Sequence, residues 1–427
     1  MSIKQYTVLS LDPMYSPLHE NIASIVAKKK YAVASCLTMK VYLPSFKFTL
    51  ATKLIKANNQ IISDDLLKKV NEVPTYHSAY VNKRENRSLN EDELQYMAKY
   101  YLALKEFIVS KGIDLVLIHN DTRWYHAIAI ILCKELGIKY LVTEQGFIRP
   151  NTTVIDEQGI NFKANLPTNS AVRPKKKYTV KHPHDSFLSM GVFGCFLLFH
   201  MVESSFNTQI KYFHNDYSLS KYFKRIMNKV NKKKRIEQKP LLFEKTVLLL
   251  LQLELDSQLL IYSEFNNNQE IISKLESECE QSGFKLAIKT HPLDDSEYHI
   301  NSGSTFVNGV ISELSRQAKM VFTVNSSAAL QVMKTMTPLY LLGDSIFDRK
   351  YVAEKVEMNC LDLDELESRE VKAEDRKNFL NMIVHNYLLH GAGFSFNKEL
   401  LNEKLQELLC KPETCDELLS DPEICNG

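Results

Sequence analysis

Residues 113–151 of the chain are IDLVLIHNDTRWYHAIAIILCKELGIKYLVTEQGFIRPN, and this stretch decides the fold. The apolar run at 113–118 is typical of a strand that is buried on both faces. A helical pattern follows from Tyr125 to Leu136, a glycine ends it, and a second apolar run lies at 139–142. A strand, a helix of this length and another strand predict a βαβ unit with parallel strands.

The same alternation of strands and helices occurs on both sides of this unit. The N-terminal sequence MSIKQYTVLSLDP predicts a first strand, and a second series of elements begins after Pro240. Its apolar runs predict strands at 246–252, 285–289, 319–324 and 338–342, with helices at 267–282 and from Ser326. Two such sheets predict an α/β protein with two Rossmann-type domains that face a central cleft. We expect an N-terminal domain, an apolar and basic helical connection, a C-terminal domain, and a C-terminal helix with an acidic tail, at residues 1–165, 166–240, 241–390 and 391–427.

The length and the composition limit the kind of protein. The chain has 427 residues, of which 44% are hydrophobic and 24% charged. This favours two folded domains and excludes a disordered, collagen-like or mucin-like protein. Lys and Arg number 53 against 51 Asp and Glu, so the overall charge indicates no partner. The eight cysteines lack zinc-binding spacing and the start of the chain lacks a signal-peptide pattern, which predicts a cytoplasmic protein with reduced thiols.

The predicted connection combines an apolar run with a basic one. Residues 187–199, FLSMGVFGCFLLF, are uncharged but number only 13, against the roughly 20 that cross a bilayer. We expect a buried helix here, with a segment in the membrane interface as the alternative. Residues 220–239 hold nine Lys or Arg and one Glu, which fits a solvated helix or a surface for anionic lipid. The run lacks the interleaved aromatics of a stacking platform, so no nucleic-acid partner is predicted.

Polar residues follow both strands of the first βαβ unit. Ligands of open α/β sheets bind beyond the carboxyl ends of the strands, so these residues are site candidates. Asp121 and Thr122 follow the first strand, where they either cap the next helix or bind a ligand. Glu144 follows the second strand and lies near Arg149 in the sequence. This pair fits a catalytic carboxylate beside an anion-binding guanidinium, and equally a structural ion pair.

The first strand of the C-terminal half also ends in polar residues. Alternation beyond the strand at 246–252 places Gln252, Glu254 and Asp256 on one face, with two leucines on the other. Packing alone does not explain a polar face at the end of an apolar strand. We therefore expect a carboxylate that points into the cleft.

The next two strands of that half end in groups that suit a phosphate. Lys289 and His291 end one strand, just before a proline that turns the chain away from the sheet. Asn325, Ser326 and Ser327 end the other strand and precede a helix. These residues can cap the helix, and its N-terminal N–H groups can bind an anion in addition. His291 is either a structural residue or a phosphate ligand.

Several common motifs are absent from the sequence. The chain has no GxxxxGK[ST] loop, no GxGxxG after the first strand and no GxSxG elbow. ATP-driven chemistry, a dinucleotide cofactor and serine hydrolysis are therefore not predicted. LDLD at 361–364 contains a DxD-like pair, but its surroundings do not indicate a metal site. We expect neither a cofactor nor a metal.

Five segments together resemble the capsule polysaccharide Kdo transferases, with which exporting bacteria build a poly-Kdo linker. Residues 119–161 are similar to the family's D-x-R-x-Y-H, E-x-G-[YF]-x-R-P and G-[VI]-N motifs. QLELDSQ resembles its Q-x-x-x-D-x-Q segment, KTHPLD its HP motif, VNSSAALQVM its N-S-[ST] segment, and LGDSIFD the region after it. The motifs occur in the expected order over residues 119–348. The chain departs from the pattern after its first strand, where Asp12-Pro13-Met14-Tyr15-Ser16 replaces a glycine-rich turn, and in having NSS where NST is commoner.

The resemblance implies a GT-B arrangement, CMP-β-Kdo as the donor, no metal, and transfer with retention of configuration. Retention can proceed through a carboxylate nucleophile that forms a covalent sugar adduct. Carried over to this sequence, Asp256 is the nucleophile and Glu144 the acid/base or the group that stabilises an oxocarbenium-like state. The two roles can also be exchanged.

The same resemblance implies the groups that bind donor and acceptor. The donor side would hold the CMP phosphate and the sugar carboxylate through His291, Ser326, Ser327 and Arg149, together with Asn325, Lys289 and Gln252. The acceptor side would be lined by Asp121, Arg123 and His126.

A single-module member of the family would start the linker on a phospholipid glycerol. The expected location is then the inner face of the inner membrane, where other capsule assembly proteins are possible partners. One alternative is a CMP-sialic acid or glycerol-phosphate transferase on the same architecture. Another is a non-catalytic capsule assembly or export component.

Overall fold

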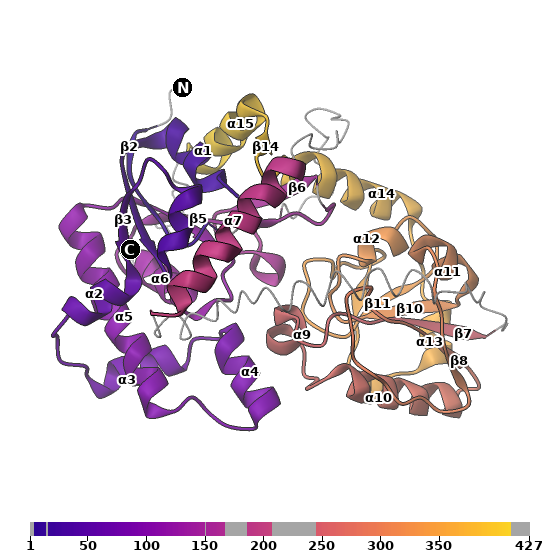
Figure 1. Ribbon diagram of the computed structural model, residues 1–427. Coiled ribbons are helices and arrows are strands. Elements are labelled where there is room, and N and C mark those ends of the chain that lie inside the picture. The colour runs from indigo at the N-terminus through magenta and orange to yellow at the C-terminus, as the bar shows by residue number, and fades with distance from the viewer. Residues whose placement is uncertain (1–3, 14–15, 150, 167–185, 207–244, 411–427) are drawn as a thin grey trace, which may run out of the picture.

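The computed structural model describes residues 4–13, 16–149, 151–166, 186–206 and 245–410. Figure 1 shows two α/β bodies side by side, one built around an N-terminal sheet and one around a C-terminal sheet. This confirms the predicted fold class, an α/β protein of GT-B type with two Rossmann-type domains.

The N-terminal sheet has eight strands in the order β14-β13-β6-β5-β4-β1-β2-β3. The parallel strands are β1 (Tyr6–Ser10), β2 (Ala27–Ala34), β3 (Lys47–Leu50), β4 (Leu115–His119) and β5 (Lys139–Gln145). An antiparallel edge follows, made of β6 (Thr152–Asp156), β13 (Leu389–Ala392) and β14 (Ser395–Phe396). The sheet is therefore mixed, whereas the sequence predicted parallel strands only.

Helices cover both faces of this sheet, which explains the continuous apolar run of β4. Val116 and Ile118 face a core shared with α2 (Ala51–Ala57), α3 (Asp64–Asn71), α5 (Glu91–Lys111) and α6 (Trp124–Glu135). Leu115 and Leu117 face the opposite core, shared with α1 (Leu18–Val26) and α15 (Lys398–Leu409). Successive strand residues point to opposite faces, so both faces require apolar side chains. The remaining N-terminal elements are α4 (Tyr76–Glu85) and the 3-10 helices η1 (Leu37–Tyr42) and η2 (Asn161–Lys163).

The C-terminal sheet has six parallel strands in the order β12-β11-β10-β7-β8-β9. They are β7 (Thr246–Leu250), β8 (Lys285–Lys289), β9 (Ser304–Phe306), β10 (Met320–Thr323), β11 (Leu339–Leu341) and β12 (Glu354–Lys355). The helical elements around it are α9 (Ser257–Tyr262), α10 (Asn268–Gln281), α11 (Ile311–Gln317), α12 (Ala329–Val332), α13 (Leu363–Ser368), α14 (Ala373–Met382), η4 (Met358–Cys360) and η5 (Ile383–Tyr387). The predicted strands and the helix at 267–282 are confirmed. The helix expected from Ser326 is only the four-residue α12, so its dipole is short.

The end of the chain returns to the N-terminal sheet. In β13, Leu389 pairs with Thr153 and His390 with Thr152 of β6. Helix α15 then packs beside α1, as Figure 1 shows. The predicted domain boundary at residue 390 therefore falls inside a strand of the N-terminal sheet. This return was not predicted, because a four-residue edge strand has no distinctive pattern.

The apolar run at 187–199 belongs to α7 (Ser186–Ser204), a 19-residue helix that crosses the front of the N-terminal body in Figure 1. The prediction of a buried helix is wrong, because Phe187 is 85% exposed and Phe199 67% exposed. The buried side chains of its last two turns include the ionisable His200 and Glu203. By length and composition the helix could cross a membrane. The basic run at 220–239 and the acidic tail from Lys411 lie outside the described residues.

Candidate functional site

The two domains enclose a cavity of about 310 Å³. Its walls come from α4, from the loop between β4 and α6, and from the loop between β7 and α9. Figure 1 shows α4 and α9 facing each other across the two bodies, and the two helices are in contact. Because β4 and β7 each run toward the cavity with their carboxyl ends, the site lies where open α/β sheets bind ligands.

Asp256 lies in the C-terminal wall of this cavity. Its carboxylate accepts a hydrogen bond from the backbone N–H of Gln258 at 2.9 Å and so caps α9. Burial raises the pKa of Asp256, and the charges of Arg149 and His291 and a hydrogen bond with Gln252 partly oppose this rise. The side chain is therefore a desolvated carboxylate whose charged form the neighbouring groups favour. One of these groups is Arg149, which follows β5 in the N-terminal domain.

Glu254 does not share a face with Asp256, contrary to the predicted alternation. The strand ends at Leu250, and the chain turns before Asp256 instead of continuing as a strand. Leu253 and Leu255 therefore line the cavity together with Asp256. An apolar lining beside one carboxylate favours a ligand with both apolar and polar surface.

Gln252 and Asn325 hold the loops of the C-terminal wall together. The side-chain oxygen of Gln252 accepts from the backbone N–H of Asn325 at 3.0 Å. The Asn325 amide donates to the carbonyl oxygens of Gln258 at 3.2 Å and Asp344 at 3.1 Å. Ser326 accepts from the backbone N–H of Ala328 at 3.2 Å. These contacts fix the loop geometry.

Ser327, Lys289 and His291 lie at the carboxyl ends of β10 and β8. Ser327 is partly exposed and lies four residues beyond the end of β10, in the segment that leads to α12. Burial lowers the pKa of Lys289. Nδ1 of His291 accepts from the backbone N–H of Leu293 at 3.1 Å, so a neutral ring carries its hydrogen on Nε2. The imidazole is thus oriented as an Nε2 donor, which is the form that a phosphate oxygen accepts.

Glu144 lies at the carboxyl end of β5 in a polar cluster of its own domain. One carboxylate oxygen accepts from the Asn120 amide at 2.8 Å, and the other from the backbone N–H of Gln145 at 2.8 Å. Nε2 of His119 lies 3.7 Å from the latter oxygen. Asn120 has a left-handed backbone, with φ of 63°, which aims its side chain at Glu144. Among the described residues, Asn120, the Gln145 backbone and His119 therefore position Glu144. An ion pair with Arg149, the structural alternative, is not among these contacts.

The three predicted acceptor-side residues lie at different depths. Arg123 lines the cavity. Asp121 is 1% exposed, and its Oδ2 accepts from the backbone N–H of Ile160 at 3.2 Å. His126 is fully buried, with Nδ1 3.0 Å from the carbonyl oxygen of Asn120, and burial holds its pKa well below the usual value. Arg123, not Asp121 or Thr122, occupies the N-cap position of α6, so the capping interpretation of those two residues is wrong.

Burial also perturbs the Asp121 carboxyl, raising its pKa from 3.8 to about 6. Lys163 opposes this rise and Glu144 adds to it. A Cβ at Gly159 would lie 2.8 Å from Oδ2 of Asp121, so the glycine of the G-[VI]-N motif lets the backbone approach this carboxyl. Asp121 is therefore a buried acid in the wall between Glu144 and the 159–163 segment.

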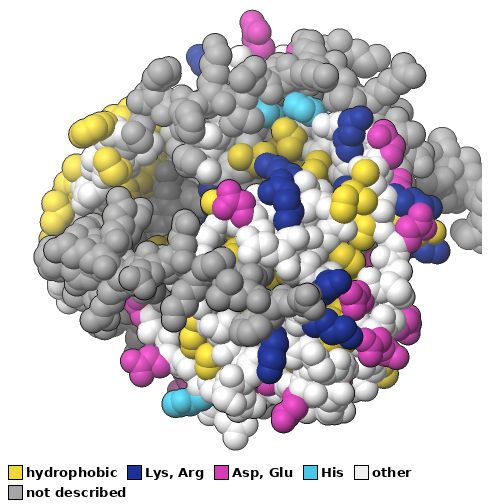
Figure 2. Space-filling model, turned by 90° about the vertical axis from the view of Figure 1, so that its right-hand side faces the viewer, with side chains coloured by type: hydrophobic (Ala, Val, Ile, Leu, Met, Phe, Trp, Pro, Cys, Tyr) yellow, Lys and Arg dark blue, Asp and Glu magenta, His cyan; other side chains and the backbone are white. Residues whose placement is uncertain are grey.

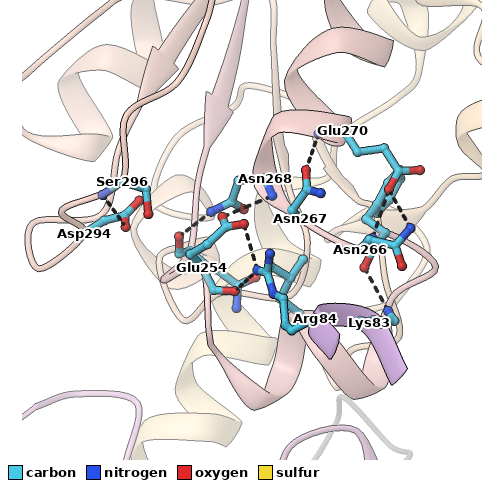
Figure 3. Close-up of polar contacts among 12 residues, drawn as sticks. Lys83, Arg84, Glu254, Asn266, Asn267, Asn268, Glu270, Asp294 and Ser296 are labelled. Atoms are coloured by element: carbon cyan, nitrogen blue, oxygen red, sulfur yellow. Dashed lines mark hydrogen bonds and ion pairs between the residues drawn. The ribbon is translucent and has the colours of Figure 1, made fainter. Parts of the chain in front are cut away.

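Helix α4 fastens the two domains beside the cavity, as Figure 3 shows. Lys83 donates to the carbonyl oxygens of Ser263 at 2.7 Å and Phe265 at 2.8 Å. Arg84 donates to the backbone oxygen and the carboxylate of Glu254, at 2.5 and 2.7 Å. The far carboxylate oxygen of Glu254 accepts from the backbone N–H of Asn268 at 3.2 Å. We call this set of contacts the α4 clasp, and it explains why Glu254 points away from Asp256.

Sequence reasoning missed both the α4 clasp and a second buried residue, Asp12. Asp12 follows β1 and is 0% exposed. Its carboxylate accepts from the backbone N–H of Ser35 at 2.9 Å, the Ser35 hydroxyl at 2.6 Å and the Tyr125 hydroxyl at 2.8 Å. The adjacent Lys83-Arg84 pair and the acid directly after the first strand were the available signals. Asp12 thus connects the segment after β1 to Tyr125 of the D-x-R-x-Y-H motif.

Known proteins are similar to this chain over the region that contains the site. The model of the family described as "Capsule polysaccharide biosynthesis protein" matches residues 114–387. The Escherichia coli protein named "Capsule polysaccharide export protein KpsS" is 25% identical over 294 residues, which cover 60% of this chain and 75% of that protein.

Two solved structures are similar at lower levels. The Thermosulfurimonas dismutans KpsC β-Kdo 2,7 transferase has a TM-score of 0.38 and 13% identity, covering 89% of this chain and 99% of the other. The β-Kdo 2,4 transferase of the same KpsC has a TM-score of 0.37 and 13% identity, covering 68% and 87%.

The matched range of the family model contains every motif of residues 119–348, so the resemblance found in the sequence is confirmed. Because that model spans more than half of the 427 residues, the chain belongs to the capsule polysaccharide biosynthesis protein family.

Proposed function

We propose that the protein is a metal-independent glycosyltransferase that moves Kdo from CMP-β-Kdo, with retention, to a phosphatidylglycerol-type lipid. The observation that carries this proposal is the placement of Asp256. It is a desolvated carboxylate in the wall of an interdomain cavity, and the neighbouring Arg149 and His291 favour its charged form. A nucleophile needs this access, and an anionic donor needs a guanidinium such as that of Arg149 and hydrogen-bond donors such as Nε2 of His291.

The proposed reaction consists of two displacements at the anomeric carbon of Kdo. A carboxylate oxygen of Asp256 forms a bond to that carbon, while the bond to the phosphate oxygen breaks and CMP leaves with the electron pair. Glu144 then takes the proton of the acceptor hydroxyl, whose oxygen attacks the same carbon and releases Asp256. Two inversions give net retention. The roles of Glu144 and Asp256 are exchanged if the sugar binds in the opposite orientation.

The donor groups divide between the two domains. On the C-terminal side, His291 offers an Nε2 donor, and Lys289, Ser326 and Ser327 lie at neighbouring strand ends. On the N-terminal side, Arg149 would pair with the carboxylate of the sugar, since a guanidinium matches that geometry. Gln252 and Asn325 would keep this wall in shape rather than bind the donor directly, because their side chains hydrogen-bond to neighbouring loops of the protein.

A lipid acceptor fits the surface of α7. Its outer side chains include Phe187, Phe199 and Val202, all more than half exposed. The front face of Figure 1 lies at the left-hand edge of Figure 2, where hydrophobic side chains gather. A helix that packs on a domain by its inner face and exposes an apolar outer face is suited to lie in a membrane interface. We propose a peripheral position on the inner face of the inner membrane.

The test is transfer from CMP-Kdo, generated in situ, to a fluorescent phosphatidylglycerol-like lipid and to a soluble Kdo-terminated acceptor. We expect product on the lipid only, and none with Asp256→Ala. The alternatives predict other results: a different CMP-sugar or a glycerol-phosphate donor would give product where CMP-Kdo gives none. A non-catalytic assembly component would bind CMP without product from any donor, and Asp256→Ala would change nothing.

The membrane position has its own test. The double variant Phe187→Asn with Phe199→Asn removes two exposed aromatic side chains without touching the inner face of α7. We expect weaker co-sedimentation with anionic vesicles and slower transfer to lipid in vesicles. Transfer to a detergent-dispersed lipid should be unchanged. Equal sedimentation of variant and wild type would place the protein elsewhere.

A further inference from the structure

Three residues with metal-binding side chains meet beneath α7, away from the interdomain cavity. They are Cys36, which follows β2, and His200 and Glu203, which lie on the inner face of α7. One ligand atom of each lies within 4.8 Å of the others, and all three residues are buried. It is the one group of three or more His, Cys, Asp or Glu side chains with this spacing among the described residues. Cys36 is more than 160 residues away from the other two in the sequence, so chain proximity does not explain its meeting with α7.

Helix α7 is apolar on its outer side and buries two ionisable residues on its inner side. His200 and Glu203 are 3% and 4% exposed, next to the buried Phe196 and Leu197. A surface helix normally buries its apolar side and exposes its charges. Burying an ionisable pair costs free energy unless its partners compensate, so the inner face of α7 requires an explanation of its own.

Hydrogen bonds satisfy Glu203 only in part. Its carboxylate accepts from the backbone N–H groups of Leu37 at 2.7 Å and Thr38 at 3.1 Å, and from the Thr38 hydroxyl at 2.8 Å. These contacts cap η1 and fix the carboxylate beside Cys36. They leave the negative charge itself without a cation among these partners, and each carboxylate oxygen retains acceptor capacity.

The surroundings of Cys36 are also negative. Asp12 accepts hydrogen bonds from the backbone N–H and the hydroxyl of the preceding residue, Ser35, and Glu203 accepts from the backbone N–H of the following residue, Leu37. Two buried carboxylates therefore lie on either side of Cys36, an arrangement that a bound cation stabilises.

We propose that Cys36, His200 and Glu203 bind a structural Zn²⁺ that fastens α7 to the N-terminal domain. A thiolate, an imidazole and a carboxylate are the ligand types of zinc, whereas magnesium and calcium prefer oxygen ligands alone. Zinc bonds of roughly 2.0–2.3 Å place tetrahedral ligand atoms roughly 3.3–3.8 Å apart, so ligand atoms at the 4.8 Å limit need to approach by about 1.0–1.5 Å. A water molecule completes the fourth position.

Binding is balanced in charge and protons. The Cys36 thiol loses its proton to solvent as sulfur bonds to Zn²⁺, and His200 binds as a neutral ring. Thiolate, carboxylate and Zn²⁺ then sum to zero charge, which removes the electrostatic cost of the cluster. The ion would connect η1 to α7. Helix α7 would then be held on the domain by metal ligation as well as by the apolar packing of Phe196 and Leu197. This role is independent of the transfer reaction.

The test is zinc content and affinity in the purified full-length chain, freed of any purification tag. We expect about one equivalent of zinc per chain by mass spectrometry of the metal, and a thiolate-to-metal absorption band after replacement by Co²⁺. Cys36→Ser and His200→Gln should lose both. Cys279→Ser is the matched control, because Cys279 is an equally buried thiol in the C-terminal core. It should keep the metal.

A second measurement covers variants that fail to fold. Chelation of wild-type protein should lower its melting temperature by several degrees, and zinc should restore it, because a ligand bound to the native state stabilises that state. Wild-type protein that holds no zinc after reconstitution at micromolar concentration would overturn the proposal. So would a Cys36→Ser variant that keeps the metal and the cobalt band.

Discussion

The two walls of the interdomain cavity treat their strand-end carboxylates differently. In the C-terminal wall, Asp256 borders the cavity, caps α9 through a backbone hydrogen bond and has a further hydrogen bond with Gln252. In the N-terminal domain, Glu144 is held by Asn120 and the backbone at the end of β5, Asp121 is almost completely buried, and neither is among the described residues that line the cavity. A strand end therefore brings a residue to the edge of the sheet, while the loop that follows decides whether its side chain meets a ligand. The comparison ranks Asp256 as the reacting group and Asp121 as a wall residue.

The largest effect is expected from Asp256. Asp256→Asn keeps an oxygen that can cap α9 but removes the charge, so kcat should fall by roughly 10³-fold or more while the fold survives. Asp256→Ala should lose the cap as well and unfold at slightly lower temperature. The measurement is steady-state transfer, with CMP binding by calorimetry as the control. A tenfold or smaller loss for Asp256→Asn would remove it from the reacting groups.

Glu144 tests the other half of the comparison. Glu144→Gln keeps the size of the side chain and its hydrogen bond to Asn120 but removes the base, and kcat should fall by roughly 10²-fold. Asn120→Ala is a matched positioning variant, because it leaves the carboxylate and removes one of its holders. Its loss should be about tenfold or less. A larger loss for Glu144→Gln than for Asp256→Asn would exchange the two proposed roles.

The α4 clasp is expected to have a smaller effect, through the relative position of the two walls. Arg84→Met leaves the carboxylate of Glu254 without its cation, where both side chains are about four-fifths buried. The free energy of unfolding should fall by about 2 kcal/mol, and KM for the donor should rise more than kcat falls. Lys377→Met is the control, since its ion pair with Glu374 is about 70% exposed. It should change stability by less than about 0.5 kcal/mol.

Much of the fold could be predicted from the sequence because both sheets are covered on both faces. Strands such as β4 and β7 then become continuous apolar runs, and their helices carry a clear period. Because these strands are apolar along their length, the polar residues at their carboxyl ends stand out in the sequence and indicate where the cavity lies. The return of the chain through β13 and the exposure of α7 could not be predicted. A short edge strand has no pattern, and a helix that is apolar all round does not indicate which side packs.

Within the site, residue identity was predictable but side-chain direction was not. Asp256 and Arg149 were expected on opposite domains, and their charges do interact. Glu254 was placed beside Asp256 by strand alternation, yet the chain turns after β7 and Arg84 holds Glu254 away. Arg84 lies 170 residues earlier in the chain. The contact between Arg84 and Glu254 depends on how the two domains are arranged, and a local sequence pattern does not predict that arrangement.

The smallest effect is expected from Asp121, and it is one of stability. Burial raises its pKa in the folded protein from 3.8 to about 6. Between these values the unfolded chain releases a proton that the folded chain keeps, so stability falls as pH rises from about 4 to about 6 and stays lower above that range. The cost of the ionised form is at most about 3 kcal/mol, at 1.36 kcal/mol per pKa unit.

Asp121→Asn should therefore raise the free energy of unfolding by about 1 kcal/mol at pH 7.5 and change it little at pH 4, as measured by urea denaturation at both values. Asp364→Asn is the control, because its carboxylate is 66% exposed beside Lys245; it should give no such difference. Such a gain would mean that the Asp121 carboxylate lowers the stability of the fold at this pH, as charged groups that serve a functional site often do. If the variant is instead less stable at pH 7.5, the buried carboxylate belongs to the framework of the N-terminal wall, and the contrast with Asp256 becomes one between a structural acid and a reacting one.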